Sequence, residues 1–177
     1  MTPSYITVEE HWTIQQVLDL DVEQPLAWSL RAVVDLRALG ERQVIIDCDV
    51  IEADGGTRCA SITGGYVALA LAFESMMKKG TLKASPMTNQ VAAVSCGIYN
   101  GHAVLDLDYP EDSAATMDAN YILTADGKIV EIQCTAEESP VTDKEVTALY
   151  RLAKKGIKQL ATAQNKAIVR GLQSLNG

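Results

Sequence analysis

The sequence predicts an α+β domain with a mixed or antiparallel sheet and helices on one face. Three observations predict this fold class: two hairpin turns lie close together in the middle of the chain, an apolar helical segment precedes them, and an amphipathic helical segment follows them. The 177 residues suffice for one domain with a sizeable core. Hydrophobic residues make up 47% and charged residues 21%, as in ordinary globular proteins. No segment approaches the roughly 18 consecutive apolar residues that a membrane span needs, so no membrane partner is expected.

The first half of the chain is expected to form a helix, a strand and a second helix. Residues 26–39 carry apolar side chains at helical spacing, and Gly40 is a plausible C-terminal cap. Residues 43–50 are short and rich in Val and Ile, which predicts a buried strand. Residues 60–79 are apolar nearly all round, which predicts a central helix that ends at Gly80.

The second half is expected to form two hairpins and a long helix. The Asn-Gly pair at 100–101 and the Asp-Gly pair at 126–127 each separate two strand-like segments, and Asn-Gly favours a type I′ turn, in which both central residues need positive φ. Thr142 and Glu145 have the spacing of a capping box. The apolar spacing after them predicts an amphipathic helix that closes the chain.

Charge and cysteine content limit the classes of function. The net charge of −8 argues against the large basic face of a typical nucleic-acid binder, so any RNA contact is expected to be local or shared between subunits. The cysteines are widely spaced and form no C-x-x-C pair, which predicts reduced packing residues. The first 25 residues lack the basic and apolar regions of a signal peptide, so a cytoplasmic location is expected.

A candidate anion site lies at "DGGTR", residues 54–58, between the predicted strand and the apolar helix. Glycines let backbone N–H groups approach an anion without a Cβ in the way, and a helix N-terminus favours negative charge. Thr57 and Arg58 add a hydroxyl and a guanidinium, so Gly56, Thr57 and Arg58 are the candidate residues. The alternative is a plain strand-to-helix turn in which Arg58 pairs with a surface carboxylate.

A candidate metal site lies in "LDLDYPEDSAATMD", which places five carboxylates within thirteen residues: Asp106, Asp108, Glu111, Asp112 and Asp118. Such oxygen ligands suit Mg²⁺, which prefers one or two carboxylates together with a substrate phosphate. The alternative is a solvated acidic loop. A loop suited to phosphate and a loop suited to a divalent metal in one small domain together indicate a phosphoryl-transfer site.

At these two segments the sequence resembles the ribonuclease PH family of bacterial exoribonucleases. The likeness covers roughly residues 29–175, and the signatures stand in the family's order: "SLRAVVDLRALGERQVIIDCDVIEADGGTRCASITGGYVALALA", "VAAVSCGIYNG", "LDLDYPEDSAATMDAN" and "VEIQCTAEESP". The resemblance implies a fold like domain 2 of ribosomal protein S5 and assembly into a ring-shaped hexamer. It also implies phosphate-dependent 3′-to-5′ trimming of tRNA precursors, with release of nucleoside diphosphates.

The resemblance also assigns roles to individual residues. It implies that Gly56, Thr57 and Arg58 hold inorganic phosphate, the co-substrate. Asp112 and Asp118 match the acidic pair that the family places at the catalytic centre and its Mg²⁺. RNA with a free 3′ end is the implied partner.

The first 28 residues depart from the family pattern. The expected division is therefore a divergent segment at 1–28 and a ribonuclease PH-like domain at 29–177, shortened at its N-terminal side. Alignment back from Ser29 without gaps places Leu18 where family members carry an arginine that helps bind phosphate or RNA. Leu18 cannot bind an anion, so weak turnover is expected. The alternative function is a catalytically impaired remnant or a non-catalytic interaction subunit of the same fold.

Overall fold

The structure is a computed structural model that describes residues 6–9, 24–137 and 140–174. Its strands are β1 (Ile6–Glu9), β2 (Ile45–Cys48), β3 (Val91–Tyr99), β4 (His102–Leu105), β5 (Met117–Thr124) and β6 (Ile129–Ala136). Its helices are α1 (Gln24–Arg31), α2 (Leu36–Leu39), α3 (Thr57–Lys78), α4 (Tyr109–Ser113) and α5 (Asp143–Ser174). Leu18 and most of the segment at 1–28 lie outside the described residues.

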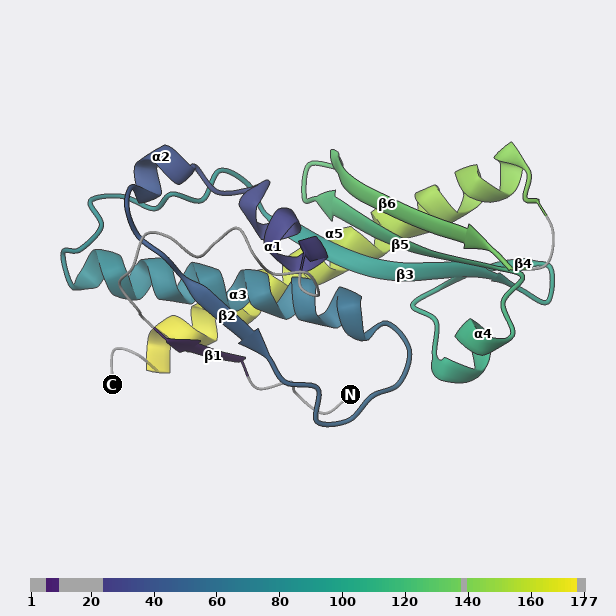
Figure 1. Ribbon diagram of the computed structural model, residues 1–177, viewed down its shortest axis with the longest axis horizontal. Coiled ribbons are helices and arrows are strands. Elements are labelled where there is room, and N and C mark those ends of the chain that lie inside the picture. Colours follow the sequence, from purple (N-terminus) through teal and green to yellow (C-terminus); the bar gives the residue numbers. More distant parts are fainter. Residues whose placement is uncertain (1–5, 10–23, 138–139, 175–177) are drawn as a thin grey trace.

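Four antiparallel strands in the order β4-β3-β5-β6 form the main sheet (Figure 1). Consecutive strands of each hairpin pair directly, and β3 pairs with β5 between the two hairpins. This arrangement confirms the predicted α+β class and the antiparallel sheet. It follows from the turn chemistry at 100–101 and 126–127, which brings each strand back beside its predecessor.

The helices cover both faces of this sheet, whereas the sequence prediction placed them on one face. Val91 and Ala93 belong to an apolar core with α3, and Ala92 and Val94 belong to a second core with α5. Because neighbouring residues of a strand point to opposite faces, α3 and α5 lie on opposite sides of β3. Burial on both faces explains why β3 is apolar without clear alternation.

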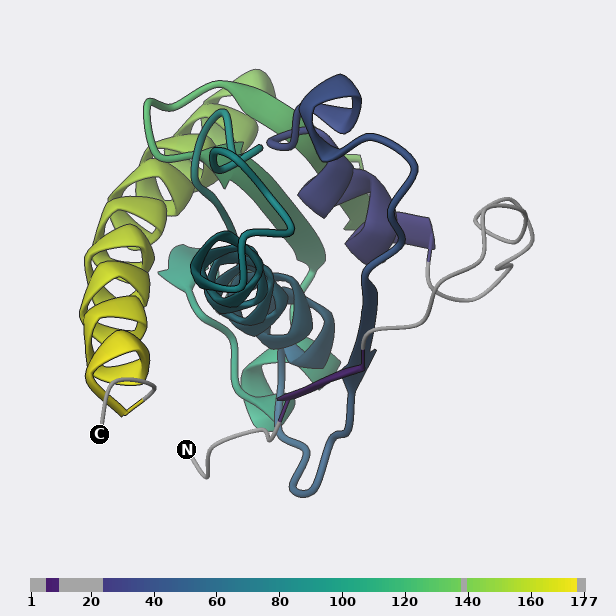
Figure 2. The ribbon, with the colours of Figure 1, turned by 90° about the vertical axis from the view of Figure 1, so that its left-hand side faces the viewer.

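Helix α3 is the central helix of the domain. It lies between α5 and the pair of strands β1 and β2 (Figure 2). Its side chains Ile62 and Phe73 are 0% and 1% exposed. By length and composition α3 would also suit a membrane span, with a mean hydropathy of 1.3, but half of that stretch is buried inside the protein. Its apolar surface is therefore accounted for by the core.

The segment at 26–39, predicted as one helix, is divided into α1 and α2. The Asp35 carboxylate accepts the N–H groups of Arg37 and Ala38 at 2.9 and 3.1 Å and so begins α2. The Asp35 N–H donates to the Pro86 carbonyl at 2.8 Å, which holds the chain in an extended course before α2. Aspartate favours such a cap over a helix interior because its side chain competes for backbone N–H groups.

The strand predicted at 43–50 is shorter and more exposed than predicted. Strand β2 pairs antiparallel with β1 in a separate two-stranded sheet, outside the main sheet. Its side chains alternate between exposed and half-buried, and Ile45 is 43% exposed. The prediction of a buried strand was wrong because apolar content alone does not reveal whether both faces of a strand are covered.

The first hairpin turn and the start of α5 follow the sequence prediction. Asn100 and Gly101 have φ values of 50° and 74°, as a type I′ turn requires. The Thr142 N–H donates to the Glu145 carboxylate at 2.7 Å, and the Glu145 N–H donates to the Thr142 hydroxyl at 3.4 Å. This reciprocal pair is the predicted capping box, and α5 begins within it.

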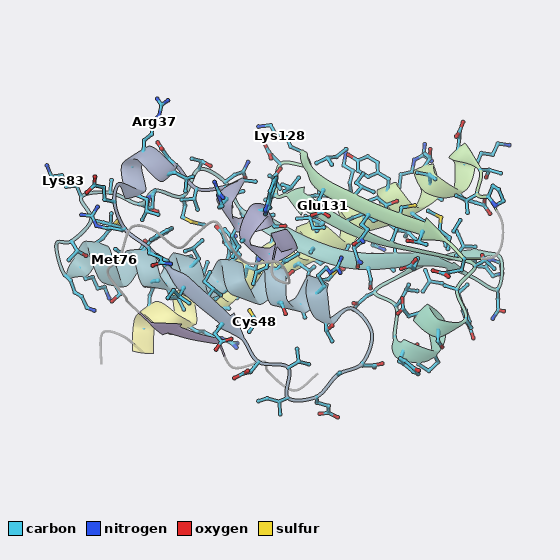
Figure 3. The ribbon with its side chains drawn as sticks, in the orientation of Figure 1. Arg37, Cys48, Met76, Lys83, Lys128 and Glu131 are labelled. Atoms are coloured by element: carbon cyan, nitrogen blue, oxygen red, sulfur yellow. The ribbon has the colours of Figure 1, made fainter. Side chains whose placement is uncertain are left out.

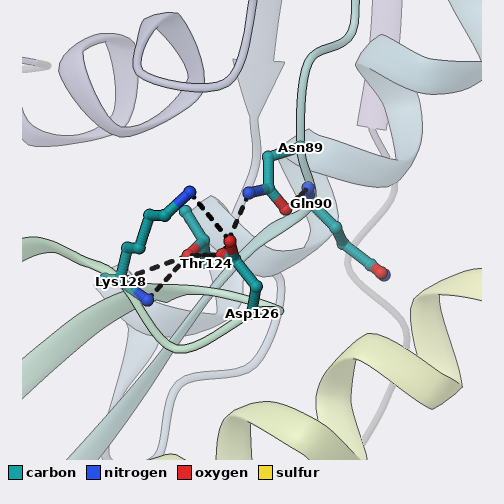
Figure 4. Close-up of polar contacts among 5 residues, drawn as sticks. All are labelled: Asn89, Gln90, Thr124, Asp126 and Lys128. Carbon is teal, nitrogen blue, oxygen red and sulfur yellow. Dashed lines mark hydrogen bonds and ion pairs between the residues drawn. The ribbon is translucent and has the colours of Figure 1, made fainter.

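The second hairpin turn is fixed by a carboxylate (Figure 4). The Asp126 carboxylate accepts hydrogen bonds from the Thr124 hydroxyl and the Asn89 amide, and it pairs with the Lys128 ammonium at 2.9 Å. These contacts, the Thr124 bond first, hold the pKa of Asp126 well below its usual range. Gly127 adopts a φ of 86°. The turn thereby sets how β5 and β6, which carry site residues, lie beside each other.

Candidate anion and metal site

A polar cavity of about 290 Å³ lies where the N-terminus of α3 meets the main sheet and α4. This volume is near the lower end of the roughly 300–1,000 Å³ range of small-molecule sites. Its walls come from α3 and the turn before it, from α4, and from three strands of the sheet: Gly56, Thr57, Arg58, Ser95, Asp112, Asp118, Ala119, Asn120, Gln133 and Thr135. The five residues to which the family resemblance assigns roles, Gly56, Thr57, Arg58, Asp112 and Asp118, therefore border the same cavity.

The turn before α3 leaves the start of the helix open to a ligand. Gly56 is the N-cap of α3 and has a left-handed φ of 73°, which glycine adopts without strain. It has no side chain that could accept hydrogen bonds from the first N–H groups of the helix. Those N–H groups and the positive end of the helix dipole are consequently available to an anion.

Direct contacts join this turn to the segment around α4. A Cβ on Gly55 would lie 2.1 Å from the Leu107 carbonyl oxygen, so the two backbones pack closer than any side chain permits. The Asp54 carboxylate also accepts the Tyr109 N–H, the first of α4, at 2.7 Å. The candidate anion turn and the candidate metal segment thus hold each other in place.

We predict that Gly55→Ala disrupts the cavity. The new methyl group must displace the 107–108 backbone, and overpacking of this kind costs typically about 1–3 kcal/mol. We expect a loss of about 2–3 kcal/mol in chemical denaturation, together with loss of phosphate-induced stabilisation.

The matched control for this change is Gly80→Ala. Gly80 follows the other end of α3 and has a φ of 73°, and a Cβ added to it would have nothing within 4 Å. The control should cost only about 1–2 kcal/mol of left-handed strain and leave phosphate binding intact. A Gly55→Ala protein with the stability and phosphate response of the parent would show that the close packing is dispensable.

Neutral polar side chains of the sheet form the floor of the cavity, and the sequence motifs did not reveal them. Ser95, Asn120 and Gln133 lie side by side across three strands, because Ser95 pairs with Asn120 and Asn120 pairs with Gln133. Thr135 pairs with Asp118 on the same face. The sequence does show polar residues at alternate positions of otherwise apolar strands. Only the strand register shows that these residues lie side by side on one face of the sheet.

Arg58 is the basic side chain that borders the cavity, and its guanidinium Nη1 donates to the Gln133 side-chain oxygen. No other lysine or arginine among the described residues borders the cavity. Arg42 donates to the carbonyl oxygens of Leu39 and Thr81, beyond the other end of α3. Arg37 projects outward from α2 (Figure 3). The positive charge available to a ligand in this cavity therefore comes from Arg58 and the helix N-terminus.

The five carboxylates of the acidic segment have different roles. Asp108 and Glu111 form a capping box that begins α4, so their oxygens are engaged by backbone N–H groups. Asp106 adopts a left-handed φ of 62° between β4 and α4 and does not border the cavity. Asp112 and Asp118 border it. The structure thus separates the predicted pair from the other three.

Asp118 has a carboxylate oxygen that a ligand in the cavity could contact. Its Oδ1 atom is buried and has no hydrogen-bond partner among the described residues. A buried carboxylate oxygen without a donor is costly, and a cation or a donor on a ligand would satisfy it. Within the described part of the chain, no three His, Cys, Asp or Glu side chains form a complete metal cage. Two carboxylates that border the candidate anion site nevertheless fit Mg²⁺, which usually keeps several waters and binds substrate phosphate.

The cysteine next to Arg58 is not suited to act as a nucleophile. The Cys59 thiol is 5% exposed and donates to the Asn120 side-chain oxygen at 3.0 Å. Burial raises the pKa of Cys59 to about 12, although the nearby Arg58 charge opposes this shift. The thiol stays protonated at neutral pH and helps hold Asn120 at the cavity floor, in accordance with the predicted packing role.

Comparisons with known proteins agree with this geometry. Residues 89–156 match a family model described as "3′ exoribonuclease family, domain 2". Ribonuclease PH of Caulobacter vibrioides, in strains NA1000 / CB15N and ATCC 19089, is 55% identical over 148 residues, a match that covers 84% of this chain and 62% of the relative. The chain thus spans about three fifths of the length of these curated relatives.

A solved structure shares the fold at low sequence identity. The crystal structure of Rrp46 from rice (Oryza sativa) superimposes with a TM-score of 0.64 at 13% identity. The superposition covers 82% of this chain and 63% of that one. The likeness supports the predicted fold class and says nothing further about the site.

Proposed function

We propose that this chain, which is similar to ribonuclease PH over 84% of its length, is a phosphate-dependent 3′-to-5′ exoribonuclease whose cavity binds inorganic phosphate beside Mg²⁺. The observation that carries the proposal is the cavity itself. It combines an open helix N-terminus and Arg58 with two carboxylates, one of which has a buried oxygen without a hydrogen-bond partner among the described residues. The helix N-terminus and Arg58 suit phosphate, and the two carboxylates suit a divalent cation.

In the proposed reaction, a phosphate oxygen attacks the phosphorus of the terminal phosphodiester. The bond from phosphorus to the 3′ oxygen of the preceding nucleotide breaks, a proton goes to that oxygen, and a nucleoside 5′-diphosphate is released. The N–H groups at the start of α3, the Thr57 hydroxyl and the Arg58 guanidinium would orient the attacking phosphate. Asp112 and Asp118 would hold Mg²⁺, which when bound offsets charge on the reacting phosphates.

The same proposal includes the partners implied by the family resemblance. We infer RNA with a free 3′ end as substrate, chiefly tRNA precursors, and a homo-oligomer with the ring-shaped hexamer as its expected form. The cytoplasm is the proposed location. Because the net charge of −8 leaves no large basic face, we expect the contact with RNA to be local to the cavity or shared between subunits.

The test is the product released from a short RNA with a free 3′ end. With phosphate and Mg²⁺ present, we expect nucleoside diphosphates rather than monophosphates, and no release without phosphate. A gapless alignment back from Ser29 places Leu18 where the family has an arginine, so we expect turnover about 10²-fold or more below that of the Caulobacter enzyme assayed alongside. Release of monophosphates independent of phosphate would refute the proposal. Phosphate binding without any release would favour the non-catalytic alternative.

A further inference from the structure

We propose that Gln133 is a positioning residue for the anion site: it holds the Arg58 guanidinium at the cavity and, being neutral, leaves the charge of Arg58 available to phosphate. The inference rests on the proposed phosphate site. It concerns a residue of β6 to which neither the two motifs nor the family resemblance assigned a role, and it assigns a role to the amide side chain itself.

The geometry places Gln133 where it can direct Arg58. The Arg58 Nη1 atom donates to the Gln133 Oε1 atom, and both residues border the cavity. Gln133 lies opposite Asn120 of β5, at the end of the polar row that starts at Ser95. Glu131, which is labelled in Figure 3, precedes it by two residues on the same face of β6.

The contact is not a by-product of burial. Both Arg58 and Gln133 are exposed, so a free arginine side chain at this position would sample many rotamers in water. Arginine presents its donors in a fixed fork, and anchoring one nitrogen fixes the direction of the others. The tether to β6 therefore reduces the rotamer freedom that phosphate binding would otherwise have to remove.

The neutral charge of Gln133 matters as much as its hydrogen bond. A glutamate of nearly the same shape would bind Arg58 more strongly, but it would cancel the positive charge next to the ligand. The cavity already contains Asp112 and Asp118. A third carboxylate would repel phosphate, whereas the amide holds the guanidinium without that cost.

The experiment compares Gln133→Leu and Gln133→Glu with the parent chain, with inorganic phosphate as the ligand. Calorimetry should show about 3–10-fold weaker phosphate binding for Gln133→Leu, the cost of ordering one rotamer-rich side chain. Gln133→Glu should weaken binding more, by about 30-fold or beyond, because it also adds a repelling charge. Cys134→Ser, on the opposite face of the same strand, is the matched control and should bind as the parent does.

Two readouts separate positioning from a merely structural role. Because Gln133 is exposed, the melting temperature without phosphate should not change in either variant. In ¹⁵N spectra of the free chain, the Arg58 side-chain signals should show restricted rotation in the parent and lose it in Gln133→Leu.

The outcomes distinguish this inference from the proposed function. If the parent chain does not bind phosphate, the proposed function fails, and the Arg58 spectra still decide whether Gln133 holds the guanidinium. Equal phosphate affinity of the parent and Gln133→Leu, or identical Arg58 signals in the two proteins, would overturn the inference. A parallel fall of the phosphate-free melting temperature would also overturn it, since it would show a structural role.

Discussion

Replacing Asp118 with asparagine is expected to lower phosphate-dependent release of nucleoside diphosphates by about 10²-fold or more, the scale of losing one preorganised charge interaction at a reaction centre. Asparagine keeps the shape of aspartate but removes the negative charge that a cation would balance. The Asp118 Oδ1 atom is buried without a hydrogen-bond partner among the described residues, so the substitution breaks no hydrogen bond at that atom. The expected loss therefore concerns chemistry and not folding.

Because the substitution should affect turnover but not folding, thermal stability is a second measurement that tests the prediction. The melting temperature of Asp118→Asn without ligands should equal or exceed that of the parent, because an uncompensated buried carboxylate oxygen is removed. Stabilisation by Mg²⁺ in the presence of phosphate should disappear. Both quantities can be measured by thermal denaturation with and without the two ions, next to the RNA assay.

The control for Asp118→Asn is Asp106→Asn. It makes the same chemical change in the same acidic segment but outside the cavity, and asparagine tolerates the left-handed φ of 62° at that position. The control should keep the turnover of the parent. If Asp118→Asn also kept it, the assignment of the metal and reaction centre to this cavity would be wrong.

Replacing Arg58 with alanine is expected to lower phosphate-induced stabilisation by half or more. Phosphate at about 100 times its dissociation constant should stabilise the parent by about 2.7 kcal/mol. In a domain of this size that corresponds to a rise of roughly 5–10 °C in melting temperature. A hydrogen bond to a charged group contributes about 1.5–3 kcal/mol, so its loss should weaken phosphate binding about 10–150-fold. At the same phosphate concentration about 0.3–1.4 kcal/mol of stabilisation would remain, so the shift in melting temperature should fall by half or more.

Two further variants test whether the effect belongs to the site. Arg58→Lys keeps the charge but loses the planar fork, so its phosphate affinity should lie between those of the parent and Arg58→Ala. Arg37→Ala removes an exposed arginine of α2 and should leave the phosphate response unchanged. A full phosphate shift in Arg58→Ala would contradict the proposal that α3 begins an anion site.

The sequence predicted the elements whose signals are local. The Asn-Gly and Asp-Gly turns, the Thr142 capping box and the apolar stretch of α3 each specify their own backbone, and the structure has all of them. The predictions were wrong where contacts with segments distant in the sequence set the bounds of a helix or the exposure of a strand. The helix predicted at 26–39 is interrupted because Asp35 caps α2 and its N–H binds the Pro86 carbonyl. Strand β2 is partly exposed because, among the described strands, it pairs with β1 alone.

The same distinction applies to the site. By itself, the sequence determined the two motifs and the residue types in them, because glycine, threonine, arginine and aspartate have a chemistry that is independent of their surroundings. The acidic motif alone did not separate its five carboxylates, and the family resemblance pointed to Asp112 and Asp118. The tertiary structure places these two at the cavity beside the candidate anion turn, while Asp108 and Glu111 cap α4. It also decided that Gln133 meets Arg58, because strand register brings together side chains that are distant along the chain, and no local pattern encodes that register.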